Sequence, residues 1–204
     1  MKKVLCFGDS NTYGFIPESK RRYDENIRWA GILKSLLGSD YEIVEAGCNN
    51  RTAFKDNPFG DEVTGYKILP KYLDETFDIV ILSIGINDSQ PAYDADIETI
   101  KQGMESFVDL AKALSPNSKF ILVSPARLSE AVLRNGYFSK LFDKKSVEKS
   151  MLYSSLYEKI AADKGCIFVD WDKIVTVSDI DGLHFSAESH KKIALAMKDV
   201  ITNL

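Results

Sequence analysis

The chain alternates short apolar runs with longer segments whose apolar residues recur at helical spacing, and this alternation limits the folds open to it. The apolar runs have strand length and lie at residues 3–7, 41–46, 78–84, 119–124 and 166–170. The helical segments follow them at residues 27–37, 61–75, 94–114, 146–164 and 186–204. Strands that alternate with helices in this way pair in parallel, because each helix returns the chain to the same end of the sheet. The sequence therefore predicts an α/β fold with helices on both faces of a five-stranded parallel sheet.

Capping residues and helix breakers set the expected limits of the first two helices. Asn26 is the expected N-cap of the first helix, and Gly38 is its expected end. Gly65 and Pro70 are expected to weaken or bend the helix over residues 61–75.

Polar residues follow several of the strands at their carboxyl ends, where open α/β sheets bind ligands. Gly8-Asp9-Ser10-Asn11 follows the first strand, Asn50 lies in the loop after the second, and Asn87 follows the third. Asp181 and His184 lie in the loop before the last helix. In a parallel sheet these residues can meet at one edge, although they are far apart in the chain.

The residue types at this edge suit nucleophilic catalysis. A serine hydroxyl becomes a good nucleophile when a base takes its proton, and His184 can serve Ser10 because an imidazole titrates near neutral pH. Asp181 lies three residues before His184, close enough in a tight turn to accept the other ring proton. Asn87 could aim its amide at a developing oxyanion, beside the backbone N–H groups of Ser10 and Asn50.

Several of these residues also have a plainer interpretation. Asn87 can simply cap or turn the chain after the third strand, and Asp181-Gly182 is a common turn pair. Asp179 competes with Asp181, but it lies farther from His184 in the sequence. His190 lies next to lysines on the last helix and is predicted to be a solvated residue.

Composition narrows the function classes. A length of 204 residues predicts one domain over residues 1–204, and 45% hydrophobic with 27% charged residues is typical of soluble globular proteins. A net charge of −4 without a basic run argues against nucleic acid or an anionic membrane as partner. No stretch is long enough to span a membrane or to form a signal sequence, so the cytoplasm is the expected location. Three widely spaced cysteines, Cys6, Cys48 and Cys166, are expected to be reduced core residues rather than disulfides or metal ligands.

Three motifs resemble blocks of a known family. Gly8-Asp9-Ser10-Asn11, Gly85-Ile86-Asn87-Asp88 and Asp181-Gly182-Leu183-His184 resemble the first, third and fifth blocks of the SGNH (GDSL-type) hydrolases. The blocks occur in the right order, and the resemblance covers essentially the whole chain.

The resemblance is closest to the intracellular arylesterase and acyltransferase branch, on Arg28-Trp29, the loop over residues 47–52 and Asp56-Asn57-Pro58. It implies a flavodoxin-like, three-layer α/β/α fold and an esterase that needs no metal or other cofactor. It also implies a capacity to form homo-oligomers.

The resemblance assigns a role to each candidate site residue. It implies Ser10 as nucleophile, His184 as base and Asp181 as the residue that orients the base. It also implies an oxyanion hole made of the Ser10 amide, the Asn87 side chain and the backbone amide of Asn50. Asn50 departs from the family pattern, which usually has glycine or alanine there, and its larger side chain could narrow the pocket or add a polar contact.

Four functions remain open at this stage. The leading hypothesis is a serine esterase for small carboxylic esters, with acyl transfer to alcohols as an extension. An O-deacetylase of acetylated carbohydrates would use the same machinery. A flavin- or nucleotide-binding module would hold a phosphate at Ser10-Asn11-Thr12, but it leaves Asn87, Asp181 and His184 without a role. The fourth is a non-catalytic binding domain.

The connection over residues 129–142 is longer than the usual α/β loop and carries several large apolar side chains, including Tyr137 and Phe138. Exposed apolar groups at this density usually cover a ligand pocket or contact a partner. A short helix packed on its own sheet is the alternative interpretation.

Overall fold

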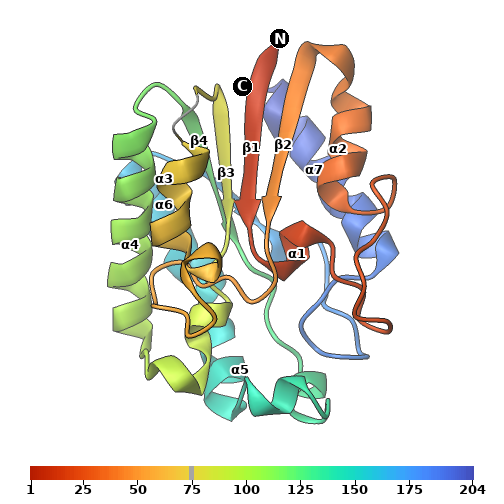
Figure 1. Ribbon diagram of the computed structural model, residues 1–204, viewed down its shortest axis with the longest axis vertical. Helices are drawn as coiled ribbons and strands as arrows, with labels where there is room; N and C mark the ends of the chain where they lie inside the picture. Colours follow the sequence, from red (N-terminus) through yellow and green to blue (C-terminus); the bar gives the residue numbers. More distant parts are fainter. Residues whose placement is uncertain (74–75) are drawn as a thin grey trace.

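Five parallel strands form a single sheet in the computed structural model, which describes residues 1–73 and 76–204. The strand order is β2-β1-β3-β4-β5 (Figure 1). This is the flavodoxin-like order, and it confirms the predicted fold class. The strands are β1 (Lys2–Gly8), β2 (Tyr41–Gly47), β3 (Ile79–Ser83), β4 (Lys119–Ser124) and β5 (Ile167–Asp170).

Each central strand divides its side chains between two apolar cores. In β1, Leu5 and Phe7 belong to one core, whereas Val4 and Cys6 belong to the other. Successive side chains on a strand point to opposite faces, so an unbroken apolar run is buried on both sides only when helices cover both faces. The apolar runs of the sequence therefore required the three-layer arrangement.

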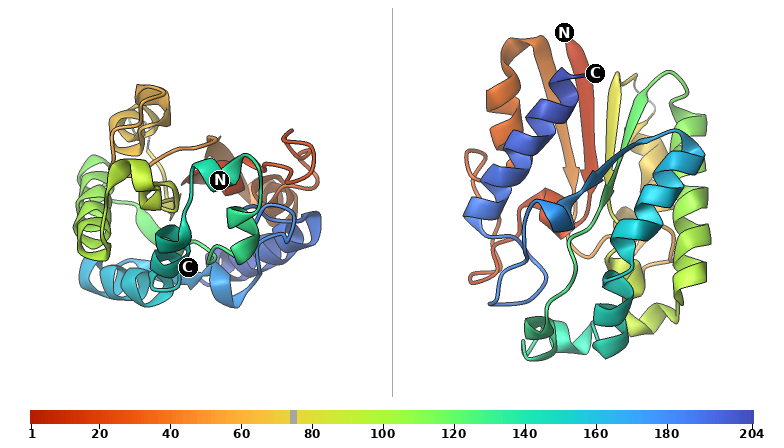
Figure 2. Two further views of the ribbon diagram at one scale, coloured as in Figure 1. Left: turned by 90° about the horizontal axis from the view of Figure 1, so that it is seen from below. Right: turned by 180° about the vertical axis from the view of Figure 1, so that it is seen from behind.

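Helices cover both faces of the sheet, as Figures 1 and 2 show. The helices α2 (Trp29–Leu37) and α7 (Ala187–Thr202) pack side by side on one face. The opposite face carries α3 (Gly65–Tyr72), α4 (Ile97–Leu114) and α6 (Tyr153–Lys164). Two short helices, α1 (Ser10–Tyr13) and α5 (Lys144–Ser150), lie beyond the carboxyl ends of the strands (Figure 1). Among the described residues, no helix combines the length and hydrophobicity needed to cross a membrane.

The start of α2 differs from the prediction, because Arg28 and not Asn26 is its N-cap. The chain first forms a turn in which the carbonyl of Asp24 accepts the N–H groups of Ile27 and Arg28. The guanidinium of Arg28 then donates two hydrogen bonds to the carboxylate of Glu45 on β2. This ion pair ties the entry of α2 to the sheet and delays the helix.

The second predicted helix is shorter than expected. A 3₁₀ turn, η2 (Asp61–Val63), precedes α3, and the predicted end at Glu75 lies outside the described residues. Gly65 opens α3 rather than weakening it. A β-carbon on Gly65 would come within 2.5 Å of the carbonyl oxygen of Thr52, so only glycine allows the two backbone segments to lie this close.

The predicted helix over residues 146–164 is in fact two helices, α5 and α6. Asp143 forms a capping box with Ser146 and starts α5 two residues earlier than expected. The hydroxyl of Ser150 donates to the carbonyl of Val147 and accepts the N–H of Leu128. These contacts end α5 where the chain from β4 crosses it. The helix α6 then ends at Gly165 in the left-handed conformation, as predicted.

Candidate active site

Ser10 lies where β1 turns sharply into α1. Asp9 is the N-cap of α1, and its carboxylate accepts the N–H of Asn11 at 2.9 Å. Gly8 makes the turn feasible, since a β-carbon there would lie 2.5 Å from the carbonyl oxygen of Ser83. Burial raises the pKa of the Asp9 carboxyl to about 7, against the opposing effect of the Asn11 N–H.

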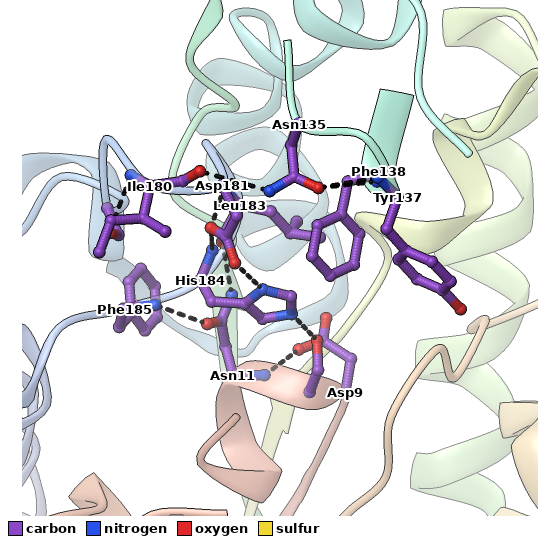
Figure 3. A network of polar contacts seen from close by, with 12 residues as sticks. Asp9, Asn11, Asn135, Tyr137, Phe138, Ile180, Asp181, Leu183, His184 and Phe185 are labelled. Carbon is purple, nitrogen blue, oxygen red and sulfur yellow. Dashed lines mark hydrogen bonds and ion pairs between the residues drawn. The ribbon is translucent and has the colours of Figure 1, made fainter. Parts of the chain in front are cut away.

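Asp181 and His184 form a tight turn at the same edge of the sheet. One carboxylate oxygen of Asp181 accepts the N–H groups of Leu183 at 3.0 Å and His184 at 2.9 Å. Its other oxygen lies 2.7 Å from Nδ1 of His184 (Figure 3). Burial alone would raise the pKa of the Asp181 carboxyl, but the hydrogen bonds from His184 and Leu183 hold it below its ordinary value.

The structure brings Ser10, His184 and Asp181 together as the sequence predicted. Nε2 of His184 lies 2.8 Å from Oγ of Ser10, and all three side chains are buried. Asn11 joins the two segments, because its Nδ2 donates to the carbonyl of Leu183 and its Oδ1 accepts the N–H of Phe185 (Figure 3). This role of Asn11 was not predicted from the sequence, although its position next to Ser10 in the first block was a signal.

Aromatic rings hold the imidazole of His184 on its other sides. The ring of Phe15 stacks on it, with centroids 4.2 Å apart and planes 30° from parallel. The ring of Phe138 lies 5.1 Å from it, on the connection between β4 and α5 (Figure 3). Together with Asp181, these contacts restrict the imidazole to one orientation.

Asn87 and Asn50 lie beside Ser10 at the ends of β3 and β2. Nδ2 of Asn87 donates to the carbonyl of Arg51 at 3.0 Å. Asn50 adopts the left-handed conformation, with φ of 58°, which asparagine tolerates better than most residues. In the part of the chain that the structure describes, no hydrogen bond occupies the backbone N–H of Ser10 or Asn50. Both groups can therefore donate to a bound molecule.

Two buried charged side chains hold the loop after β2, and the sequence analysis assigned neither a role. Asp88 accepts the N–H groups of residues 53–55 at distances between 2.7 and 3.0 Å. Burial raises the pKa of its carboxyl to about 6 in spite of these contacts. The guanidinium of Arg51 donates to the carbonyls of Gly8 and Ala46. Asp88 belongs to the third block itself and Arg51 directly follows Asn50, and these positions were the available signals.

A cavity of about 160 Å³ opens beside Ser10. Tyr137 and Phe138, from the connection over residues 129–142, form part of its wall. Phe138 is buried, whereas Tyr137 is 54% exposed. The lining residues are Ser10, Phe15, Asn49, Asn50, Asn87, Tyr137, Phe138, Leu141, Phe142, Leu183 and His184.

Residues 1–73 and 76–204 contain no group of three or more histidine, cysteine, aspartate or glutamate side chains placed to hold a metal ion. The three cysteines are free thiols, but only Cys6 is fully buried. The polar groups that line the pocket include the hydroxyl of Ser10, the imidazole of His184 and the amides of Asn49, Asn50 and Asn87.

The prediction for His190 was wrong, because this side chain is fully buried. Its Nδ1 accepts the N–H of Trp29 at the start of α2, at 3.2 Å. Its ring also lies edge-on to those of Tyr23 and Phe185. Burial, with a smaller effect of the charge on His184, lowers the pKa of His190 to about 3. His190 thus joins α7 to α2 as a neutral residue and lies outside the candidate site.

The chain is similar in sequence and in structure to known proteins. The GDSL-like Lipase/Acylhydrolase family matches the chain over residues 6–192. The structure of an aryl esterase from M. smegmatis is 27% identical, with a TM-score of 0.91 and 100% of both chains covered. Est24, a carbohydrate acetylesterase from Sinorhizobium meliloti, is 29% identical, with a TM-score of 0.91, over 100% of this chain and 99% of its own. A search of the curated proteins found no match.

Proposed function

Because the chain belongs to the GDSL-like lipase/acylhydrolase family, we propose that it is a serine esterase that hydrolyses small carboxylic esters through an acyl-enzyme. The observation that carries the proposal is the continuous chain of short contacts from Ser10 through His184 to Asp181. This is the geometry that activates a serine hydroxyl in unrelated hydrolases.

In the first half of the reaction, Oγ of Ser10 attacks the ester carbonyl while Nε2 of His184 takes its proton. The carboxylate of Asp181 accepts a hydrogen bond from Nδ1–H of His184, which fixes the tautomer and stabilises the imidazolium. The tetrahedral intermediate then collapses, and His184 returns the proton to the leaving alcohol. In the second half, water attacks the acyl-Ser10 ester while His184 takes its proton, and His184 then returns that proton to Oγ of Ser10 as the carboxylic acid leaves. An alcohol in place of water would give acyl transfer.

Three N–H donors surround the place where negative charge develops. They are the backbone N–H groups of Ser10 and Asn50 and the side-chain amide of Asn87. Donors fixed before the reaction stabilise the oxyanion without reorganisation, and removing one such donor typically costs about 10²- to 10³-fold in kcat.

The size of the cavity favours small acyl groups. A cavity of about 160 Å³ is smaller than the roughly 300–1,000 Å³ of typical small-molecule sites. Phe15, Phe138 and Leu141 make most of this wall apolar, which suits a short acyl chain or an aromatic leaving group.

A second candidate function is the O-deacetylation of carbohydrates, and the polar part of the lining favours it. Asn49 and Asn50 also line the cavity, and amide side chains can bind sugar hydroxyls. The carbohydrate acetylesterase from Sinorhizobium meliloti is among the similar structures. Comparing kcat/KM for phenyl acetate, naphthyl acetate and acetylated xylose would separate the two substrate classes.

Replacing Ser10 with alanine tests the mechanism. We expect Ser10→Ala to lower kcat for p-nitrophenyl acetate by on the order of 10⁴-fold or more and to abolish labelling by a fluorophosphonate, because no acyl-enzyme can form. Ser155→Ala is the matched control, since this serine is exposed on α6. If Ser10→Ala kept most of the activity, the serine mechanism would be wrong. If the parent protein failed to label, a non-catalytic binding domain would be the better assignment.

A further inference from the structure

We propose that Gln90 is a positioning residue for the oxyanion donors, and that it acts by holding the side chains of Asn87 and Asn50 with one amide group. The inference rests on the proposed esterase function. It concerns a residue outside the three sequence blocks that carry the family resemblance.

Gln90 lies where the chain leaves η3 (Asn87–Ser89), the 3₁₀ turn that follows β3. Its backbone N–H donates to the carbonyl of Asn87 at 3.2 Å, and its side chain folds back toward the pocket. There Nε2 donates to Oδ1 of Asn87 at 3.1 Å and to Oδ1 of Asn50 at 2.9 Å. Gln90 is only 3% exposed, so these contacts are protected from water.

The contacts leave one consistent orientation for these amides. The carbonyl of Arg51 can only accept, so the nitrogen of the Asn87 amide must face it, at 3.0 Å. The oxygen of Asn87 therefore faces Gln90, which must present its NH₂ group. An amide NH₂ has two hydrogens, and Oδ1 of Asn87 and Oδ1 of Asn50 use one each. Both N–H groups of the Gln90 side chain are therefore occupied.

This arrangement has a direct consequence for catalysis. One N–H of Asn87 is bound to Arg51, and the second is left to donate to the oxyanion. Its direction depends on the amide plane, which Arg51 and Gln90 fix from opposite ends. Without Gln90 the amide can rotate, and the donor must then be reoriented during the reaction. Because the oxyanion exists only in the transition state, the loss falls on kcat rather than KM.

Asn50 receives the second N–H of Gln90, which links the loop after β2 to the turn after β3. The backbone carbonyl of Asn50 also accepts Nδ2 of Asn57 at 2.8 Å. The left-handed residue is therefore held on both its side chain and its backbone, and its own N–H keeps its place beside Ser10. One glutamine thus supports two of the three proposed oxyanion donors.

A double-mutant cycle on kcat tests the proposal. We expect Gln90→Leu to lower kcat for p-nitrophenyl acetate by about 10- to 10²-fold, less than full loss of an oxyanion donor, with KM and the pH profile of kcat unchanged. In the Asn87→Ala background, the same substitution should lower kcat by clearly less than in the parent, because one of the two donors that Gln90 supports is already gone and only its contact with Asn50 remains to be lost. Gln102→Leu is the matched control, since this exposed glutamine on α4 donates to Glu98 and does not line the cavity. Additive effects of the two substitutions, or a shifted pH profile, would overturn the proposal.

Gln90→Glu provides a second test, because the glutamate side chain has nearly the same shape as that of glutamine. A buried carboxyl group has a raised pKa, and its ionised form donates no hydrogen bond. We therefore expect the ratio of variant to parent kcat to rise as the pH is lowered, because protonation restores one donor. A ratio independent of pH, or failure of both Gln90 variants to fold, would assign Gln90 a purely structural role. These outcomes are distinct from failure of the esterase proposal, in which Ser10→Ala would retain activity and the parent would not label.

Discussion

His190 makes the stability of this protein depend on pH, and its contribution can be isolated by one substitution. The pKa of His190 is about 3 in the folded protein and 6.5 in the ordinary exposed state. As the pH falls below 6.5, His190 binds a proton in the unfolded chain but stays neutral in the folded protein. The contribution of His190 to the free energy of unfolding is therefore fully present above pH 6.5 and is lost as the pH falls from 6.5 to 3.

The magnitude follows from the pKa difference. One proton changes the free energy of unfolding by about 1.4 kcal/mol per pH unit, so the loss is about 2 kcal/mol between pH 8 and pH 5 and approaches about 5 kcal/mol near pH 3. Asp9 and Asp88 act in the opposite direction, because burial raises their pKa values to about 7 and about 6. Their protonation stabilises the fold as the pH falls and masks His190 in the parent protein.

The difference between parent and His190→Asn removes this masking. Asparagine keeps an acceptor near the position of Nδ1 for the N–H of Trp29, but it does not titrate. Urea unfolding can be followed by the fluorescence of Trp29 and Trp171, which are buried with ring centroids 5.7 Å apart. We expect the stability advantage of the parent to shrink by about 2 kcal/mol from pH 8 to pH 5. A difference that stays constant with pH would refute a buried neutral histidine, whatever its absolute size.

The remaining predictions concern the pocket and its loops. Asn87→Ala should lower kcat by about 10²- to 10³-fold with KM little changed, whereas Asp88→Ala should mainly lower the thermal midpoint, because three backbone N–H groups lose their acceptor. Steady-state kinetics and thermal unfolding of both variants would show the reverse pattern if Asp88 were the oxyanion donor. Asn50→Gly should keep kcat on acetyl esters within about tenfold, or about 1.4 kcal/mol, and improve the use of longer acyl chains. Identical chain-length profiles would remove the steric explanation. Replacing both Tyr137 and Phe138 with serine should change acyl-chain preference or oligomeric state while fluorophosphonate labelling continues, and a chain-length series with light scattering would detect either effect. No change in either property would exclude a role as lid or interface.

The sequence alone determined the architecture, because the signals for it are local. The central strands β1, β3 and β4 carry apolar runs that can be buried on both faces only in a sheet covered by helices. Parallel pairing follows from the helices between the strands, whereas the strand order was implied by the family resemblance. The assembly of Ser10, Asp181 and His184 was also predictable. Asp181 and His184 lie three residues apart in one turn, and carboxyl ends of parallel strands share an edge.

Element boundaries were less predictable, since tertiary contacts compete with capping preferences. Asn26 is a good capping residue by type, but the ion pair between Arg28 and Glu45 moved the start of α2. The apolar pattern over residues 146–164 is that of one helix. In the structure the helix is interrupted after Ser150, whose hydroxyl accepts the N–H of Leu128 from the chain that follows β4. Helix propensity depends only on the residues within a segment. The partners Glu45 and Leu128 lie outside the helices that they limit, so propensity could not predict their effect.

Only the tertiary structure decided which polar residues are buried and what they hold. His190 carries the sequence signature of a solvated helix position, yet it contacts the N–H of Trp29, 161 positions away. Gln90 meets Asn50 across 40 positions, and Asp88 meets the loop over residues 53–55 across a similar span. Whether a polar side chain meets water or a partner depends on which segments cover it. That covering is settled by packing of the whole chain, so no local pattern shows which partner each of these three residues contacts.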